Sequence, residues 1–309
     1  VNLTQLTGTG AGGRITRKDV LIFIENGPTK ADVSIPASSP VQQSIPATKE
    51  TLSSKSEEPA SQAALAKARP NQVEITEDGD EIIPVSSVRK TIASRMVQSK
   101  HDAPHAWTMV EVDVTSLVKY RNGVKDEFKQ KEGLSLTFLP FFIKAVVEAL
   151  KEYPLMNSTW AGDKIIVKKR INISIAVATE DALYVPVIHD ADQNSLLGIA
   201  KSIDDLAKRA RAGRLSMADM QGGTFTVNNT GSFGSILSAP IINSPQAAIV
   251  SMESIVKKPV VIDDMIAVRS MVNLCLSLDH RVLDGLVCGK FLQSVKFKLE
   301  NYGPETKLY

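Results

Sequence analysis

The pattern of apolar and polar positions changes near residue 80. From Glu81 onward, apolar side chains recur at helical spacing in some stretches and alternate as in strands in others. Four helices are predicted, over residues 85–100, 136–153, 195–213 and 285–299. Strands are predicted over residues 107–114, 172–179, 184–190, 223–229, 247–253, 258–264 and 271–280.

The predicted helices carry local start and stop signals. The second ends before Pro154 and is apolar along most of its length, so we expect deep burial. The third closes at Gly213. The first has apolar residues at helical spacing behind a serine cap: Val88, Ile92, Met96 and Val97. A few long helices against a strand-rich sheet predict one α/β (α+β) domain over residues 80–309.

Two shorter regions precede this domain. Residues 27–79 are rich in Pro, Ser and Ala with almost no large apolar residues, which predicts a flexible linker. Residues 1–26 form a small unit with a glycine-rich loop and a short helix expected from Thr16 to Ile24. The glycine run does not follow a strand within a βαβ unit, so a dinucleotide site is not favoured.

Composition narrows the class of protein. The net charge of +2 gives no argument for nucleic-acid binding. No stretch approaches the roughly 20 apolar residues of a membrane span, and two lone cysteines, Cys275 and Cys288, fit a reducing cytoplasm better than a disulfide framework. Because the first residue is not Met, we expect the chain to be part of a longer protein.

The sharpest chemical signal is LSLDHRVLDG, residues 276–285. His280 follows a long apolar strand, where an imidazole is placed in a cleft rather than in a ladder. Asp284 lies at the start of the next helix, where a carboxylate is favoured, and Gly285 permits a tight turn. No further Cys or His clusters nearby at metal-ligand spacing, so no metal site is predicted.

The stretch DHRVLDG resembles the signature of the family that contains the acyltransferase cores of 2-oxoacid dehydrogenase complexes and chloramphenicol acetyltransferase. The resemblance implies a trimeric, chloramphenicol-acetyltransferase-like catalytic domain with a mixed sheet. It also implies that His280 is a general base for a thiol, with Asp284 holding the site. Such a base is needed because most of a free thiol is protonated at neutral pH.

A tetrahedral oxyanion needs a donor, and the resemblance places it on the segment GGTFTVNNTGSFGS, residues 222–235. By register the position falls on Asn228, where the family has a hydroxyl; Thr226 and Asn229 are nearby substitutes, and an ordinary strand and turn is the alternative. We assign Gly231 and Ser232 to coenzyme A. His105 and Trp107 are expected to line the lipoyl side of a channel, with core packing as an equal alternative.

The N-terminal segment GTGAGGRITRKDV resembles half of a peripheral-subunit-binding domain. The resemblance implies that Arg14, Arg17 and Lys18 contact a 2-oxoacid decarboxylase or dihydrolipoyl dehydrogenase. It also implies a lipoyl-lysine on a domain outside this chain, and homotrimers that assemble into a larger core. Leu308 and Tyr309 form either a free tail or assembly contacts.

The segments APHAW and NLCLSLDHRVLDG look closest to bacterial branched-chain acyltransferases. Acetyl or succinyl specificity and a noncatalytic scaffold remain as alternatives. A free-standing acetyltransferase for a small molecule shares the histidine motif but would not need residues 1–79.

Overall fold

The computed structural model describes residues 74–75, 78–179 and 182–309. All of these belong to one compact unit, Arg69–Tyr309. The unit predicted for residues 1–26 and the linker to residue 79 fall almost entirely outside the described residues. Among the described residues, no helix is long and apolar enough to cross a membrane.

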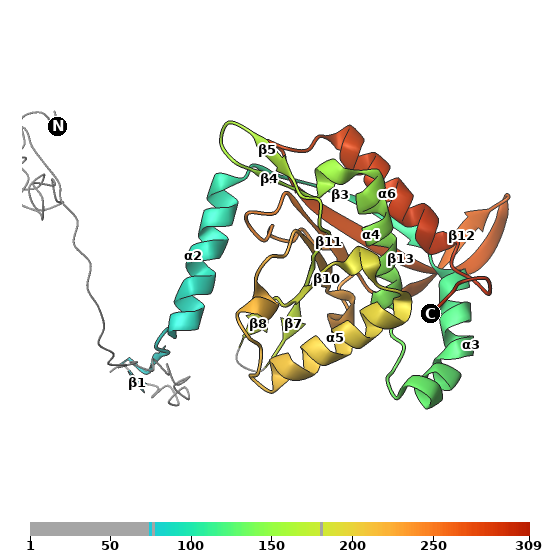
Figure 1. Cartoon of the computed structure of the whole chain (residues 1–309), viewed down its shortest axis with the longest axis horizontal. Helices are drawn as coiled ribbons and strands as arrows, with labels where there is room; N and C mark the ends of the chain where they lie inside the picture. Colours follow the sequence, from blue (N-terminus) through green and yellow to red (C-terminus); the bar gives the residue numbers. More distant parts are fainter. Residues whose placement is uncertain (1–73, 76–77, 180–181) are drawn as a thin grey trace, which may run out of the picture. The chain divides into compact units, whose positions relative to one another are not determined.

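A seven-stranded mixed sheet forms the centre of this unit (Figure 1). Its strand order is β12 (Val256–Ile262), β13 (Met265–Asp279), β11 (Ala248–Met252), β10 (Phe225–Asn229), β6 (Ile173–Ile175) and β9 (Val187–Ile188), with β3 (His105–Asp113) also paired to β13. Strand β10 runs parallel to β11 and β6, and the other pairs are antiparallel. The mixed sheet expected from the sequence is confirmed.

The two faces of the sheet differ in chemistry. Because side chains alternate along a strand, each strand contributes to both faces. One face, which we call the helix face, joins the hydrophobic core through Phe225, Val227, Val250, Leu274, Leu276 and Leu278. The other, which we call the polar face, carries Thr226, Asn228, Ser251, Cys275 and Ser277. The candidate oxyanion donor is therefore on the polar face.

Three helices gather over the helix face (Figure 1): α4 (Leu139–Glu152), α5 (Leu196–Arg211) and α6 (Gly285–Glu300). The burial predicted for α4 is confirmed, since nine of its residues are buried, among them Phe141 and Phe142. Phe291 of α6 is also fully buried. Each such side chain contributes roughly 1.5–3 kcal/mol when removed from water.

The predicted helix ends are also confirmed. The first helix, α2 (Ser87–Asp102), is capped by Ser86, whose side chain accepts a hydrogen bond from the Arg89 amide at 3.2 Å. Helix α5 is capped by Ser195, and Gly213 follows its last turn with φ of +64°. Only glycine adopts this left-handed conformation without a steric cost.

Helix α2 projects from the sheet (Figure 1). The other described residues leave much of its apolar side uncovered. Val97 is 69% exposed and Val88 is 50% exposed. Contact with the rest of the chain is made near the C-terminal end of the helix, where buried Ser99 donates its hydroxyl to the Ile242 carbonyl at 2.6 Å.

The structure contains one long helix that the sequence pattern did not predict, α3 (Thr115–Glu132). Only Leu117 and Phe128 of its 18 residues are buried, so its periodic signal is weak. A second difference concerns residues 172–190. Instead of two strands they form β6 and β9 in the main sheet and a separate pair, β7 (Val177–Ala178) with β8 (Leu183–Tyr184).

The remaining elements are short. Two further strand pairs are β1 (Glu74–Ile75) with β2 (Glu81–Ile82) and β4 (Ser158–Trp160) with β5 (Ile165–Val167). Single turns of 3₁₀ helix are η2 (Pro154–Met156), η3 (Ala191–Gln193), η4 (Ala218–Met220) and η5 (Gly231–Phe233).

The C-terminal tail packs on its own chain and is not free. Leu308 is buried, and its carbonyl accepts a hydrogen bond from the Leu197 amide at 2.9 Å. The ammonium group of Lys131 lies 4.4 Å from the centre of the Tyr309 ring. The expectation of a free tail is therefore wrong for these two residues, whereas a role in assembly stays a prediction.

Candidate active site

His280 begins the turn between β13 and α6. Strand β13 ends at Asp279, and the His280 backbone amide donates to the Pro104 carbonyl at 3.0 Å. The residue is exposed, whereas Val282 and Leu283 after it are buried. The backbone is thus held on both sides while the imidazole remains accessible, which suits a group that exchanges protons with a substrate.

An ion pair next to His280 stabilises this turn. Asp279 is 3% exposed, and both its carboxylate oxygens accept hydrogen bonds from the Arg281 guanidinium at 2.7–3.2 Å. The carboxylate raises the pKa of Arg281. The guanidinium also lies 5.3 Å from the centre of the Trp160 ring. Sequence reasoning overlooked this pair, although its members immediately flank the histidine.

Asp284 is the N-cap of α6. Its carboxylate accepts a hydrogen bond from the Val287 amide at 2.9 Å. The predicted position at the helix start is confirmed, and the contact fixes where α6 begins. The geometry is consistent with a structural rather than a reacting carboxylate.

His105 lies opposite Asp279 in the pairing of β3 with β13. Its Nε2 accepts a hydrogen bond from the Ile242 amide at 3.1 Å, so its Nδ1 carries the proton and donates to the Ala103 carbonyl at 2.8 Å. With both nitrogens bonded internally, this ring is poorly placed to transfer protons. Trp107, two residues along the same face, is 53% exposed.

The structure separates the three candidates for the oxyanion donor. The Thr226 hydroxyl is buried and donates to the Gln246 side-chain oxygen at 2.5 Å. Asn229 points to the opposite face, where it lines a cavity with Phe138 and Leu139. Asn228 is on the polar face, and its side-chain nitrogen donates to the Ser251 hydroxyl at 3.5 Å. An amide nitrogen has two hydrogens, so one stays available for an oxyanion.

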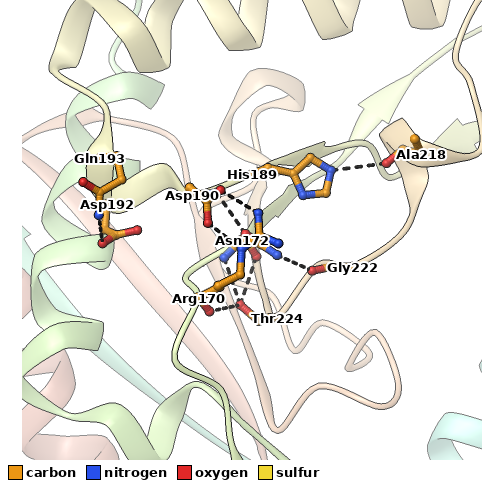
Figure 2. A network of polar contacts seen from close by, with 9 residues as sticks. All are labelled: Arg170, Asn172, His189, Asp190, Asp192, Gln193, Ala218, Gly222 and Thr224. Atoms are coloured by element: carbon orange, nitrogen blue, oxygen red, sulfur yellow. Dashed lines mark hydrogen bonds and ion pairs between the residues drawn. The ribbon is translucent and has the colours of Figure 1, made fainter.

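A polar network positions the start of β10 (Figure 2). The side chain of Asn172 donates to the Gly222 carbonyl at 2.7 Å and accepts from the Asp190 amide at 2.9 Å. The backbone amide of Asn172 donates to the Thr224 hydroxyl at 3.0 Å. Glycine is required at position 223, because a Cβ there would lie 2.1 Å from the Ser174 hydroxyl oxygen. These contacts fix the register of the strand that carries Asn228.

Gly231 and Ser232 form the turn after β10. A Cβ on Gly231 would lie 2.3 Å from the Glu253 carbonyl oxygen, so a close backbone approach requires glycine here. The exposed Ser232 donates its hydroxyl to the Asn229 carbonyl at 3.1 Å. Their assignment to coenzyme A stays a prediction.

The predicted site residues fall into two groups at opposite ends of the strands. Asn228 is level with Ser251 and Cys275, whereas His280 lies five residues beyond Cys275. At roughly 3.3 Å per residue this is about 16 Å along the sheet, before the width of two strands is added. His105 and Trp107 are in the His280 group, and Gly231 and Ser232 are in the Asn228 group. Arg14, Arg17 and Lys18 lie outside the described residues.

The two cysteines are both fully buried. Burial raises the pKa of Cys275, and it raises the pKa of Cys288 to about 12. Since the thiolate is the nucleophile, neither thiol is suited to covalent catalysis.

Comparison with known proteins places the chain in a family. The model of the 2-oxoacid dehydrogenases acyltransferase (catalytic domain) matches residues 77–306, and that of the e3 binding domain matches residues 1–21. The chain therefore belongs to the 2-oxoacid dehydrogenase acyltransferase family, as the sequence resemblance predicted.

Three relatives are informative. The lipoamide acyltransferase component of the branched-chain alpha-keto acid dehydrogenase complex of Bacillus subtilis is 59% identical over all of this chain, which spans 70% of that protein. The structure of a probable dihydrolipoamide acetyltransferase from Listeria monocytogenes is 65% identical, with a TM-score of 0.74 over 75% of this chain and 100% of that one.

The third relative is an Azotobacter vinelandii dihydrolipoamide acetyltransferase that is 34% identical. Its structure has a TM-score of 0.70 over 72% of this chain and 93% of that one. It was studied for the role of a serine, a histidine and an asparagine in its catalytic mechanism. These similarities confirm the predicted class of enzyme, a dihydrolipoamide acyltransferase with a mixed sheet and packed helices.

Proposed function

We propose that this chain transfers a branched-chain acyl group between a dihydrolipoyl thiol and coenzyme A, as the core of a branched-chain 2-oxoacid dehydrogenase complex. The observation that carries the chemistry is the accessible His280 on a rigidly held turn at the end of β13. The choice of acyl group rests on the 59% identity to the Bacillus subtilis relative along the whole chain.

In the proposed reaction His280 takes the proton from the attacking thiol as its sulfur bonds to the thioester carbonyl carbon. The carbonyl oxygen becomes an oxyanion, and the free N–H of Asn228 donates to it. The intermediate collapses by breaking the original carbon–sulfur bond, and the departing thiolate takes the proton back from His280. Asp284 keeps the turn and helix in place and exchanges no proton.

The site is completed by two copies of the chain. The separation of about 16 Å or more between Asn228 and His280 is too large for both to reach one thioester from the same chain. In a trimer, His280 of one copy would face Asn228 of the next. This arrangement also explains why the predicted site residues form two separate groups.

The Azotobacter vinelandii enzyme supports these assignments. The serine, histidine and asparagine studied there are separated by the same intervals as Asn228, His280 and Asp284. The histidine is shared, whereas this chain has Asn228 in place of the serine and Asp284 in place of the asparagine. Asn228 retains a donor for the oxyanion, and Asp284 retains a helix-capping oxygen.

The proposal includes partners and substrates. Coenzyme A and a lipoyl-lysine are the acyl carriers, with Gly231 and Ser232 on the coenzyme A side and His105 and Trp107 on the lipoyl side. The match of residues 1–21 to the e3 binding domain supports docking of dihydrolipoyl dehydrogenase or a decarboxylase. Arg14, Arg17 and Lys18 would make the contacts, and trimers would assemble into a larger core.

The name of the Listeria monocytogenes relative favours acetyl transfer as a second candidate. The test is acyl transfer to free dihydrolipoamide by the assembled core, with isobutyryl-, isovaleryl-, acetyl- and succinyl-CoA compared by kcat/KM. The branched-chain assignment predicts the highest values for the first two. A clear preference for acetyl-CoA would overturn that assignment and leave the acyltransferase chemistry intact.

A further inference from the structure

Glu253 is a buried carboxylate to which the proposed mechanism assigns no role. It follows β11 and is 1% exposed. Among the described residues no lysine, arginine or histidine forms an ion pair with it. Burial alone would raise its pKa, but hydrogen bonds from surrounding hydroxyls, among them those of Ser238 and Thr230, outweigh it and lower the pKa below its ordinary value. An isolated buried charge is costly, so this one calls for a functional or structural explanation.

A chain of hydrogen bonds runs from Glu253 to Asn228. The Thr230 hydroxyl lies 2.8 Å from Oε2 of Glu253 and 2.8 Å from the Ser251 hydroxyl. The Ser251 oxygen in turn lies 3.5 Å from the side-chain nitrogen of Asn228. The last link is the longest, and hydrogen bonds in catalytic sites are often long in the free enzyme.

The ionised carboxylate sets the direction of every bond in this chain. A carboxylate only accepts, so Thr230 must donate its single hydrogen to Glu253. Ser251 must then donate its own hydrogen to the Thr230 oxygen, which leaves the Ser251 oxygen as an acceptor. Only the nitrogen of the Asn228 amide can bond to an acceptor, so the amide nitrogen rather than its oxygen is directed along the polar face.

The backbone around this row of hydrogen bonds is equally constrained. Gly231 packs directly on the backbone of Glu253, and the Ser254 hydroxyl donates to the Gly231 carbonyl at 2.8 Å. The Ser254 amide donates to the Ser235 carbonyl at 2.7 Å. The turn after β10 and the end of β11 therefore form one tightly fastened unit around the carboxylate.

We propose that Glu253, acting through Thr230 and Ser251, is a positioning residue that orients the Asn228 amide for the developing oxyanion. The inference rests on the proposed role of Asn228. It explains why a buried carboxylate that forms no ion pair with the described residues accompanies an amide at this position. A side-chain amide can donate from its nitrogen or accept at its oxygen, so its orientation has to be fixed. The Ser251 oxygen, which acts as an acceptor, fixes the nitrogen of Asn228 toward it.

The test compares Ser251→Ala with Ser238→Ala in the assembled core. Ser238 donates to the other oxygen of the same carboxylate, Oε1, and does not lie on the path to Asn228. Ser251→Ala should lower kcat about 10-fold, a fraction of the loss from deleting an oxyanion donor, with KM nearly unchanged. Ser238→Ala should stay within about twofold of the wild type. Equal losses in the two variants would overturn the proposal.

Two further measurements separate this inference from the proposed function. With Asn228→Ala as background, Ser251→Ala should cause no additional loss of kcat, because the group that it positions is gone. The same additional loss in both backgrounds would contradict positioning while leaving the role of Asn228 intact. If Asn228→Ala itself retained full kcat, the oxyanion role and the inference would both fail.

A second variant covers the case in which Ser251→Ala does not assemble. Thr230→Val removes the middle link in the row of hydrogen bonds with little change in side-chain volume, and Thr230→Ser retains the hydroxyl. The positioning role predicts a loss of kcat for Thr230→Val and recovery of activity for Thr230→Ser. A loss of equal size in both would show that the hydroxyl is not what matters.

Discussion

The two ends of the central strands hold their candidate catalytic groups in different ways. His280 is fixed through its backbone, by the Pro104 carbonyl and by buried neighbours, and its ring is left exposed. Asn228 is fixed through its side chain, at the end of a directed row of hydroxyls that leads to Glu253. A base must exchange its proton with two different thiols, whereas an oxyanion donor must keep one orientation. The difference in anchoring matches the difference in the roles proposed for the two residues.

The largest effect is expected at the histidine. His280→Ala should reduce kcat by about 10²–10⁴-fold, the usual range for loss of a general base. The matched control is His101→Ala at the exposed end of α2, which should retain wild-type turnover. The measurement is acyl transfer from isobutyryl-CoA by assembled cores of each variant. Unchanged turnover in His280→Ala would return the chain to the scaffold interpretation.

The next largest effect is expected at Asn228, at the other end of the central strands. Asn228→Ala should reduce kcat by roughly 10²–10³-fold, as for other oxyanion donors. Asn228→Ser restores a hydrogen-bond donor and should retain more activity than the alanine variant. If serine and alanine were equally damaging, donation to the oxyanion would not be the function of this position.

Asp284 should affect stability more than chemistry. Asp284→Ala removes the cap of α6 and should lower the free energy of unfolding by about 1 kcal/mol, while Asp284→Asn keeps a capping oxygen. Denaturant unfolding of the cores measures this difference. A kcat loss in Asp284→Asn as large as that in His280→Ala would show that the carboxylate takes part in the reaction.

The smallest effect is the pH dependence that Glu253 gives to stability. Its folded pKa is below the ordinary value of 4.5, so its contribution is present above that value and is lost as pH falls through the folded pKa. Stability should therefore fall more steeply below about pH 5 in the wild type than in Glu253→Gln. The nearby Cys275 stays protonated throughout, because its pKa is raised. Glu305→Gln, at an exposed position, should follow the wild type.

Features encoded locally were predicted well from the sequence. The apolar run of α4, the serine cap of α2, the end of α5 at Gly213 and the placement of Asp284 at a helix start all depend on neighbours within a few residues. Helix α3 was missed because only two of its residues are buried, which leaves little periodicity to read.

Features that depend on distant pairing could not be predicted. The sequence offered Thr226, Asn228 and Asn229 as oxyanion donors, and the choice requires knowing which face each occupies and that Gln246 already binds Thr226. Glu253 gave no signal, because its partners reach it only once β10 and β11 are paired. The distance between Asn228 and His280 likewise follows from strand register alone.

Mixed cores test whether the active site is shared between two copies of the chain. Cores co-assembled from equal amounts of His280→Ala and Asn228→Ala chains contain some interfaces at which both groups are intact. A shared site predicts recovery of about a quarter of wild-type turnover per chain, because His280 and Asn228 at one interface are each intact in about half of the cases. A site within one chain would leave the mixture at the level of the single variants, and that result would show that the site is not shared.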